Sequence, residues 1–438
     1  MKNEQLIKKY FDVIRDKELS VTNKIKKLSY ILNIGGNIND KERKSLKTGL
    51  MVALEQENKE LVEWFLDNDC DVNAVDVENR TALFFVKDKD IAQKLIEKGA
   101  DVNHRAFGGR TPLMANGGVE VARVLIDNGA DIFLQTHYYR WNLSENSYTY
   151  IEGGISTLMS AVLCNDYDKA KLLIEGGVDV NKLNDNNENC LLYALVRTSN
   201  IDIELVKLLV DNGINLEEKD KNYNSIMHFV RRGDLADYLL KRGGNIYMEN
   251  LQEQTPFMNV IEFGDVECVK VFVENSGDVN YMEKNSGETL LIGAIKHGRL
   301  DVIDYLIEKG ADVNLEGKYG NRPIYSVVCS GSSVSKDILE KLIKNGVKIN
   351  AKNCHGENAI LMAVFEQAPL EVVDLLLKNG ADYKVKNKSG VSAWKMLAME
   401  AYKEGENPIA DLVWIEEKRR KSTLIGKVQG VLGGIWGR

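Results

Sequence analysis

Apolar residues recur along the chain in short helical patterns, and each pattern runs into the same turn phrase. A clear copy is LIEKGADVN at 95–103. Related copies end at residues 39, 73, 133, 181, 217, 247, 280, 314, 350 and 384. The leucines have helical spacing, and the glycine suits the left-handed residue that ends a helix. The pattern predicts a helix with a buried face in every copy, so we expect Leu306 and Leu375 to be core residues.

A second phrase follows each turn by about eight residues and predicts the start of another helix. Examples are GGRTPLM at 108–114, EQTPFM at 253–258 and GETLLI at 287–292. Thr can cap a helix, and Pro suits its first position because its φ angle is already set. The unit is therefore a helix pair. Successive turn phrases end 30 to 36 residues apart, except for one step of 48, and this indicates a tandem repeat in which each unit packs on its neighbours.

This repeat resembles the ankyrin family, whose repeats join a TPLHxA start to an LLxxGADVN end. The resemblance covers roughly residues 20–400. It implies an all-α solenoid of about a dozen stacked helix-turn-helix units, and it implies protein binding as the common use. The nearest alternative is a tetratricopeptide array, but the Trp-Gly-Tyr pattern of that repeat is absent.

The repeat boundaries divide the chain into six expected segments. These are an N-terminal capping helix pair at 1–39, ankyrin repeats at 40–133, a β-hairpin insertion at 134–155, ankyrin repeats at 156–390, C-terminal capping helices at 391–421 and a basic glycine-rich tail at 422–438. The repeats at 81–99, 111–129 and 225–243 are three residues shorter than the one at 289–310. Their shortness predicts a clipped first helix or a clipped turn.

The 48-residue step contains the insertion LQTHYYRWNLSENSYTYIEGGI. Two alternating, aromatic-rich runs flank the polar segment 144–147, and this pattern predicts a β-hairpin. Tyr, Trp and Arg are enriched at binding hot spots. The candidate partner-binding residues here are Tyr138, Tyr139, Arg140, Trp141, Tyr148 and Tyr150. The alternative is that the hairpin covers a neighbouring repeat.

The turns just before the second phrase vary between repeats while the flanking phrases stay constant. In the ankyrin family these positions are exposed, and variable positions on a fixed frame are where specificity can lie. The further candidate partner-binding residues are Phe107, Tyr223, Leu251, Tyr319 and His355. The alternative for each is a plain solvated loop.

Charge narrows the class of partner. The chain has 57 basic and 65 acidic residues. Residues 418–438 contain six bases and no acid. The rest of the chain therefore has 51 bases and 65 acids, a net charge of −14. This acidic part of the chain would repel the phosphates of a nucleic acid, and it favours a protein partner that is itself basic. The tail alone has the sign for an anionic surface.

No pattern in the sequence indicates catalysis. The five histidines fall in different repeats, and we find no nucleotide-binding, zinc-protease or serine-hydrolase motif. Six cysteines without a CxxC pair suit reduced thiols in a cytoplasmic protein, and no run of 18 apolar residues predicts a membrane-spanning helix. We expect a monomeric, non-enzymatic interaction scaffold that binds a protein partner through its concave face and the inserted aromatic hairpin, without cofactor or metal. The alternatives are a membrane-associated adaptor that uses the tail, and an inhibitor or immunity-type protein that occludes a basic partner.

Overall fold

In a computed structural model of the chain, the structure describes residues 2–136, 139–142, 147–150, 153–198, 200–331, 333–397 and 408–420. At residues 2, 3, 139–142, 147–150 and 319 it describes the backbone alone. The chain divides into two units, Met1–Phe229 and Val230–Arg438, and each contains its own stack of helix pairs.

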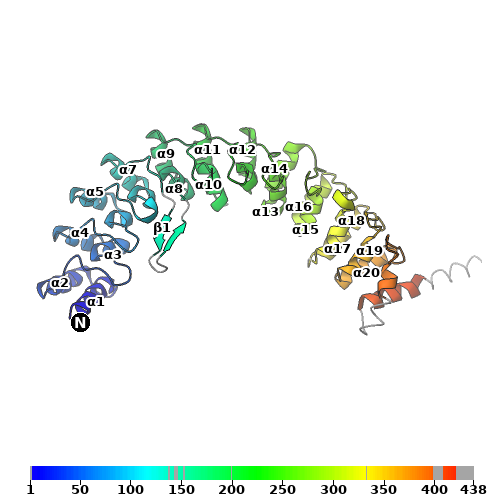
Figure 1. Ribbon diagram of the computed structural model, residues 1–438, viewed down its shortest axis with the longest axis horizontal. Coiled ribbons are helices and arrows are strands. Elements are labelled where there is room, and N and C mark those ends of the chain that lie inside the picture. The colour runs from blue at the N-terminus through cyan, green and yellow to red at the C-terminus, as the bar shows by residue number, and fades with distance from the viewer. Residues whose placement is uncertain are drawn as a thin grey trace, which may run out of the picture. The chain divides into compact units, whose positions relative to one another are not determined.

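Unit 1 begins with a helix pair and continues with repeats whose first and second helices alternate (Figure 1). Its helices are α1 (Lys2–Arg15), α2 (Val21–Asn33), α3 (Gly49–Glu55), α4 (Lys59–Asp67), η1 (Ala82–Phe85), α5 (Lys89–Glu97), η2 (Phe107–Gly109), α6 (Pro112–Ala115), α7 (Val119–Asp127), α8 (Thr157–Leu163), α9 (Tyr167–Glu175), α10 (Cys190–Arg197), α11 (Ile203–Asp211) and η3 (Ile226–Phe229). The η elements are single turns of 3-10 helix.

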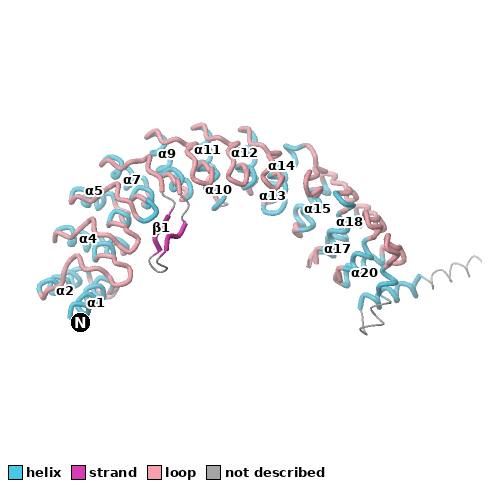
Figure 2. The backbone as a smooth tube through the Cα atoms, in the orientation of Figure 1, coloured by secondary structure: helices cyan, strands magenta, loops and turns pink. Residues whose placement is uncertain are grey.

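Unit 2 repeats the same alternation of helices and loops (Figure 2). Its helices are α12 (Gly233–Lys241), α13 (Pro256–Phe263), α14 (Val266–Ser276), α15 (Leu290–Lys296), α16 (Leu300–Glu308), η4 (Lys318–Gly320), α17 (Pro323–Cys329), α18 (Ser335–Lys344), α19 (Ala359–Phe365) and α20 (Leu370–Lys378). Helical segments at 393–397 and 408–420 follow. The predicted all-α stack of helix pairs is confirmed.

The core lies along the first helices. In α15 every residue from Leu290 to Ile295 is buried, whereas α16 buries one face only. Leu306 on that face is fully buried, as predicted. The prediction for Leu375 is wrong, because this side chain is only half-buried and the neighbouring Leu376 is fully buried. Leu376 is the first residue of its turn phrase, as Leu306 is of its own, so the core position had been placed one residue too early.

Three first helices are clipped, as the short repeats predict. The elements η1, α6 and η3 each contain four residues, against seven in α15. The predicted end of the second helices is also confirmed, since glycines such as Gly99 have a positive φ, here +88°. Helix starts are capped by the predicted residues, and the Thr111 hydroxyl accepts the N–H of Met114 at 3.3 Å.

Two short strands lie within the insertion, β1 (Tyr139–Asn142) and β2 (Ser147–Tyr150), and they pair antiparallel. A bridge between Gln135 and Ser156 closes the base of the insertion. The strands extend from the side of unit 1 that carries α3 and α8, away from α7 and α9 (Figure 1). Among the described residues these are the only strands that form a sheet.

Candidate functional site

Each pair of helices is joined to the next by a finger, by which we mean the residues from the end of one turn phrase to the N-cap of the next first helix. The residue two positions before the N-cap has a positive φ, between +54° and +79°, in each finger. Most of these residues are Gly or Asn, which adopt this conformation at little cost. The exceptions are Leu46, Tyr223 and Glu253. The fold therefore fixes a left-handed turn at every fingertip.

Tyr223 is the most unusual of the three exceptions. Its φ is +64° and its side chain is 53% exposed. The ammonium nitrogen of Lys219 lies 5.5 Å from the centre of its ring. A bulky residue in this conformation costs of the order of 1–2 kcal/mol.

Backbone hydrogen bonds join neighbouring fingertips. In unit 1 the N–H of Phe107 donates to the carbonyl of Glu78 at 3.0 Å, and that of Lys221 donates to Asn186 at 3.0 Å. In unit 2 the N–H of Lys388 donates to the carbonyl of His355 at 2.9 Å. Several neighbouring fingertips are therefore joined directly within each unit.

A second set of contacts, which sequence reasoning missed, joins the bases of the fingers. The last residue of the turn phrase is usually Asn, and its amide binds backbone groups of the next repeat. Both atoms of the amide do so at Asn73, Asn103, Asn181, Asn314 and Asn350. The signal was the recurrence of Asn at one exposed position. The series is interrupted just before the insertion by Phe133, which is 65% exposed.

The inserted hairpin has a register that sorts its residues by face. Tyr139 is paired with Tyr150, and Trp141 is paired with Tyr148. Directly opposed residues share a face, and alternate residues on a strand do too. These four aromatic positions therefore lie on one face of the two-stranded sheet, and Arg140 lies on the other. Strand β1 contacts η2, which contains Phe107.

The structure places the predicted site residues in two groups. In unit 1 the hairpin residues lie beside half-buried Phe107, and Tyr223 lies at another fingertip. In unit 2 Leu251 is 58% exposed and His355 is exposed. Tyr319 belongs to η4, where only its backbone is described, and Tyr138 lies outside the described residues.

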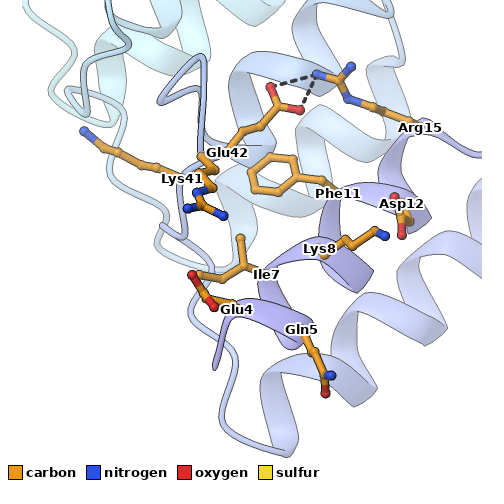
Figure 3. Close-up of a pocket in the computed structure, with 10 residues that line it drawn as sticks. Glu4, Gln5, Ile7, Lys8, Phe11, Asp12, Arg15, Lys41 and Glu42 are labelled. Atoms are coloured by element: carbon orange, nitrogen blue, oxygen red, sulfur yellow. Dashed lines mark hydrogen bonds and ion pairs between the residues drawn. The ribbon is translucent and has the colours of Figure 1, made fainter. Parts of the chain in front are cut away.

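A groove of about 640 Å³ lies between α1 and residues 41–43 (Figure 3). Ile7 and Phe11 line its apolar part. At one side the guanidinium of Arg15 pairs with Glu42 at 2.9 Å. The remaining charged lining residues are Glu4, Lys8, Asp12, Lys41 and Arg43. Acids and bases thus line the groove in nearly equal numbers, and its charge selects no ligand class.

Two of the thiols and one of the histidines have clearly structural surroundings. Burial raises the pKa of the Cys190 thiol to about 12 and that of Cys70 to about 11, so both are protonated at neutral pH. His228 Nδ1 accepts the N–H of Ser225 at 3.0 Å, within the start of its own helix. Over the described part of the chain no group of His, Cys, Asp and Glu is arranged to hold a metal. No described helix has both the length and the apolar character needed to cross a membrane.

The basic cluster near the C-terminus is partly engaged in the fold. Glu416, on the helix at 408–420, accepts hydrogen bonds from Arg419 at 2.7 Å and Arg420 at 2.8 Å. Arg420 also donates to the carbonyl of Ala381 at 3.0 Å, beyond the end of α20. Of the four bases at 418–421, Arg420 thus fastens the terminal helix to the last repeat, whereas Arg419 pairs within that helix.

Comparisons with known proteins agree with this architecture. The chain is 39% identical over 111 residues to an ankyrin repeat protein of Acanthamoeba polyphaga mimivirus, a match that covers 25% of this chain and 33% of that relative. The match thus spans a third of the length of this curated relative. The ankyrin repeat domain of Bcl-3, a member of the IkappaB family, is similar with a TM-score of 0.41 and 21% identity, over 51% of this chain and 98% of that one. The model of the family described as ankyrin repeats in three copies matches residues 22–106, 50–136, 158–250 and 226–317. These matches span more than half of the chain, which therefore belongs to the ankyrin-repeat family.

Proposed function

We propose that the chain is a non-enzymatic protein-binding module that holds its partner through the inserted hairpin and the neighbouring fingers of unit 1. The observation that carries the proposal is the register of β1 and β2, which puts Tyr139, Trp141, Tyr148 and Tyr150 on one face. Clustered aromatic residues supply large contact areas at protein interfaces. The strain at Tyr223, in the same unit, supports the proposal independently.

The wider surroundings support a protein partner over other ligands. Binding modules of this fold use a rigid stack to present variable loops. All six cysteines are free thiols, which suits the reducing cytoplasm. The adaptor alternative receives less support, because Arg419 and Arg420 already bind Glu416. The idea of a basic partner depends on the net charge of the whole chain, which does not describe any one surface.

The test is a double substitution, Tyr139→Ala with Trp141→Ala, in the full chain. The partner would first be isolated with the tagged protein from its native source and identified by mass. The double variant should then bind that partner at least about thirtyfold more weakly, since hot-spot residues contribute about 2 kcal/mol or more. Tyr30→Ala is the matched control, because Tyr30 is 61% exposed on α2, away from the hairpin.

The melting temperature of the double variant distinguishes a hairpin that binds a partner from one that only covers a neighbouring repeat. If the hairpin only covers a neighbouring repeat, the double variant should melt about 10 °C lower or more, because losses of several kcal/mol shift a melting point by this much. Such a fall, or unchanged binding to the partner, would overturn the proposal. A liposome flotation assay with and without residues 418–438 tests the adaptor alternative separately.

A further inference from the structure

Charge is distributed unevenly along the fingers of unit 2. Its first two fingers, 247–255 and 280–289, contain four acids and one base. Its last three fingers, 314–322, 350–358 and 384–392, contain six bases and two acids. The basic residues of these three are Lys318, Arg322, Lys352, Lys384, Lys386 and Lys388. We call the last three fingers the basic strip, and its net charge is +4 in a chain whose total is −8.

The acids of the basic strip are engaged by partners within it. Glu316 pairs with Arg322. Glu357 accepts hydrogen bonds from Asn353 at 3.0 Å and from Asn387 at 3.3 Å. A carboxylate fixed in this way is oriented toward the protein and is less able to neutralise a neighbouring surface lysine. The negative charge of the strip is therefore used internally.

Three of its lysines are available to a partner. Lys352, Lys386 and Lys388 are exposed. Within the described residues, none of their ammonium groups makes an ion pair or a hydrogen bond. Lys384, by contrast, pairs with Glu417 at 2.9 Å. The available charge thus concentrates on two adjacent fingers.

The backbone holds these fingers close together. The carbonyl of His355 accepts the N–H of Lys388 at 2.9 Å, which joins the two tips directly. At the preceding tip, a Cβ atom placed on Gly320 would lie only 2.8 Å from the backbone nitrogen of Cys354. The lysines therefore form one positive surface on backbone that is already fixed. A ligand that binds them does not have to order the loops first.

We propose that the basic strip binds an acidic segment of a protein partner. This inference rests on the proposed function and specifies the chemistry of the partner at this end of the chain. Lysine ammonium groups pair well with carboxylates, and rows of opposite charge steer association and fix register. A long nucleic acid is disfavoured, because Glu249 and Glu253 on the first finger of the same unit would repel a polyanion that extends along the fingers.

The net charge of the chain points the other way, towards a basic partner, and the structure explains the difference. Acids also lie outside the fingers, for example Asp301, Asp304 and Glu308 on the second helix α16. A short acidic segment that lies on the fingers meets the lysines first, and charges farther away than about 8 Å are largely screened at physiological salt. Local charge therefore decides this contact.

The experiment compares two triple variants of the full chain that change net charge equally. One is Lys352→Gln with Lys386→Gln and Lys388→Gln; the control is Lys336→Gln with Lys344→Gln and Lys378→Gln, three exposed lysines of α18 and α20. The probes are fluorescein-labelled oligoglutamate and a single-stranded DNA of equal charge, read by anisotropy at low and at physiological salt. The strip variant should bind oligoglutamate about tenfold more weakly or worse, and the control should stay within about twofold of wild type.

Three results would overturn the proposal. One is absence of oligoglutamate binding by the wild-type chain at low salt. Another is an equal loss in both triple variants, which would mean that net charge alone matters. The third is tighter binding of DNA than of oligoglutamate with the same loss in the strip variant, which would assign the strip to nucleic acid. The oligoglutamate assay needs no native partner. Its result can therefore be interpreted even if the hairpin substitutions do not change partner binding.

Discussion

The side-chain amide of Asn103 donates a hydrogen bond to the carbonyl oxygen of Gly129, 2.9 Å away in the next repeat. The oxygen of the same amide accepts the backbone N–H of Asp131 at 2.8 Å. One side chain thus binds two backbone groups of the turn that follows α7. This contact joins consecutive repeats at the bases of their fingers.

We predict that Asn103→Ala lowers the free energy of unfolding by about 1–2 kcal/mol, because two partly exposed hydrogen bonds are lost. Asn222→Ala is the control, since Asn222 is exposed at a fingertip and its side chain makes no hydrogen bond with the described residues. Urea denaturation followed by circular dichroism measures both. Equal losses in the two variants would contradict a role for Asn103 between repeats.

The corrected register of the second helices can be tested with two leucines. Leu306→Ala should cost about 2–5 kcal/mol, because it empties a fully buried site. Leu375→Ala should cost less than half as much, because this side chain is only half-buried. Denaturant unfolding of the two variants gives the comparison. If Leu375→Ala were the more destabilising of the two, the register of α20 would be wrong.

The left-handed turn at Tyr223 predicts a conflict between stability and binding. Tyr223→Gly should raise the free energy of unfolding by up to about 1 kcal/mol, because glycine adopts a positive φ without strain. The same change should weaken binding of the protein partner. Glu253→Gly is the matched control, with a φ of +57° at the equivalent position of another finger. It should stabilise the fold and leave binding at unit 1 intact; a stabilised Tyr223→Gly variant with full affinity would remove Tyr223 from the interface.

The C-terminal helix should respond to acid through Glu416. The hydrogen bond from Arg419 lowers the pKa of Glu416 below its ordinary value, and the hydrogen bond from Arg420 adds to this effect. Partial burial acts in the opposite direction but does not cancel it. A depressed carboxyl pKa stabilises the folded state above the unfolded pKa, which is near 4.3, and that stability is lost as pH falls through the folded pKa. Wild type should therefore melt above Glu416→Gln at about pH 7, and the gap should close on acidification below about pH 4. A gap that stayed constant down to about pH 3 would contradict this role.

Local physics made most of the fold predictable from the sequence. A glycine that ends a helix, a Thr that begins one and leucines at helical spacing act within a few residues of one another. Repetition of these signals then identified the helix pairs, and the three short repeats identified the clipped elements η1, α6 and η3. Leu375 shows the limit, because a single-residue error in register exchanges a core side chain for a half-buried one.

The candidate site was less predictable, because it depends on which residues of different repeats become neighbours. The sequence located the aromatic insertion and the variable turns, but only the pairing of β1 with β2 put Tyr139, Trp141, Tyr148 and Tyr150 on one face. The sequence showed Asn at the end of many turn phrases, but only stacking showed that the amide reaches the next repeat.

The distribution of charge shows most clearly what the sequence determines and what the tertiary structure determines. The sequence by itself determined the repeat, its period, its helix ends and the total charge of −8, because each is a local property or a sum. It did not determine where that charge lies, since a sum carries no position. Only the tertiary structure joined the two fingers that carry Lys352, Lys386 and Lys388. Electrostatic attraction falls with distance and is screened by salt, so the surface that a partner meets is set by this folded arrangement and not by the composition of the chain.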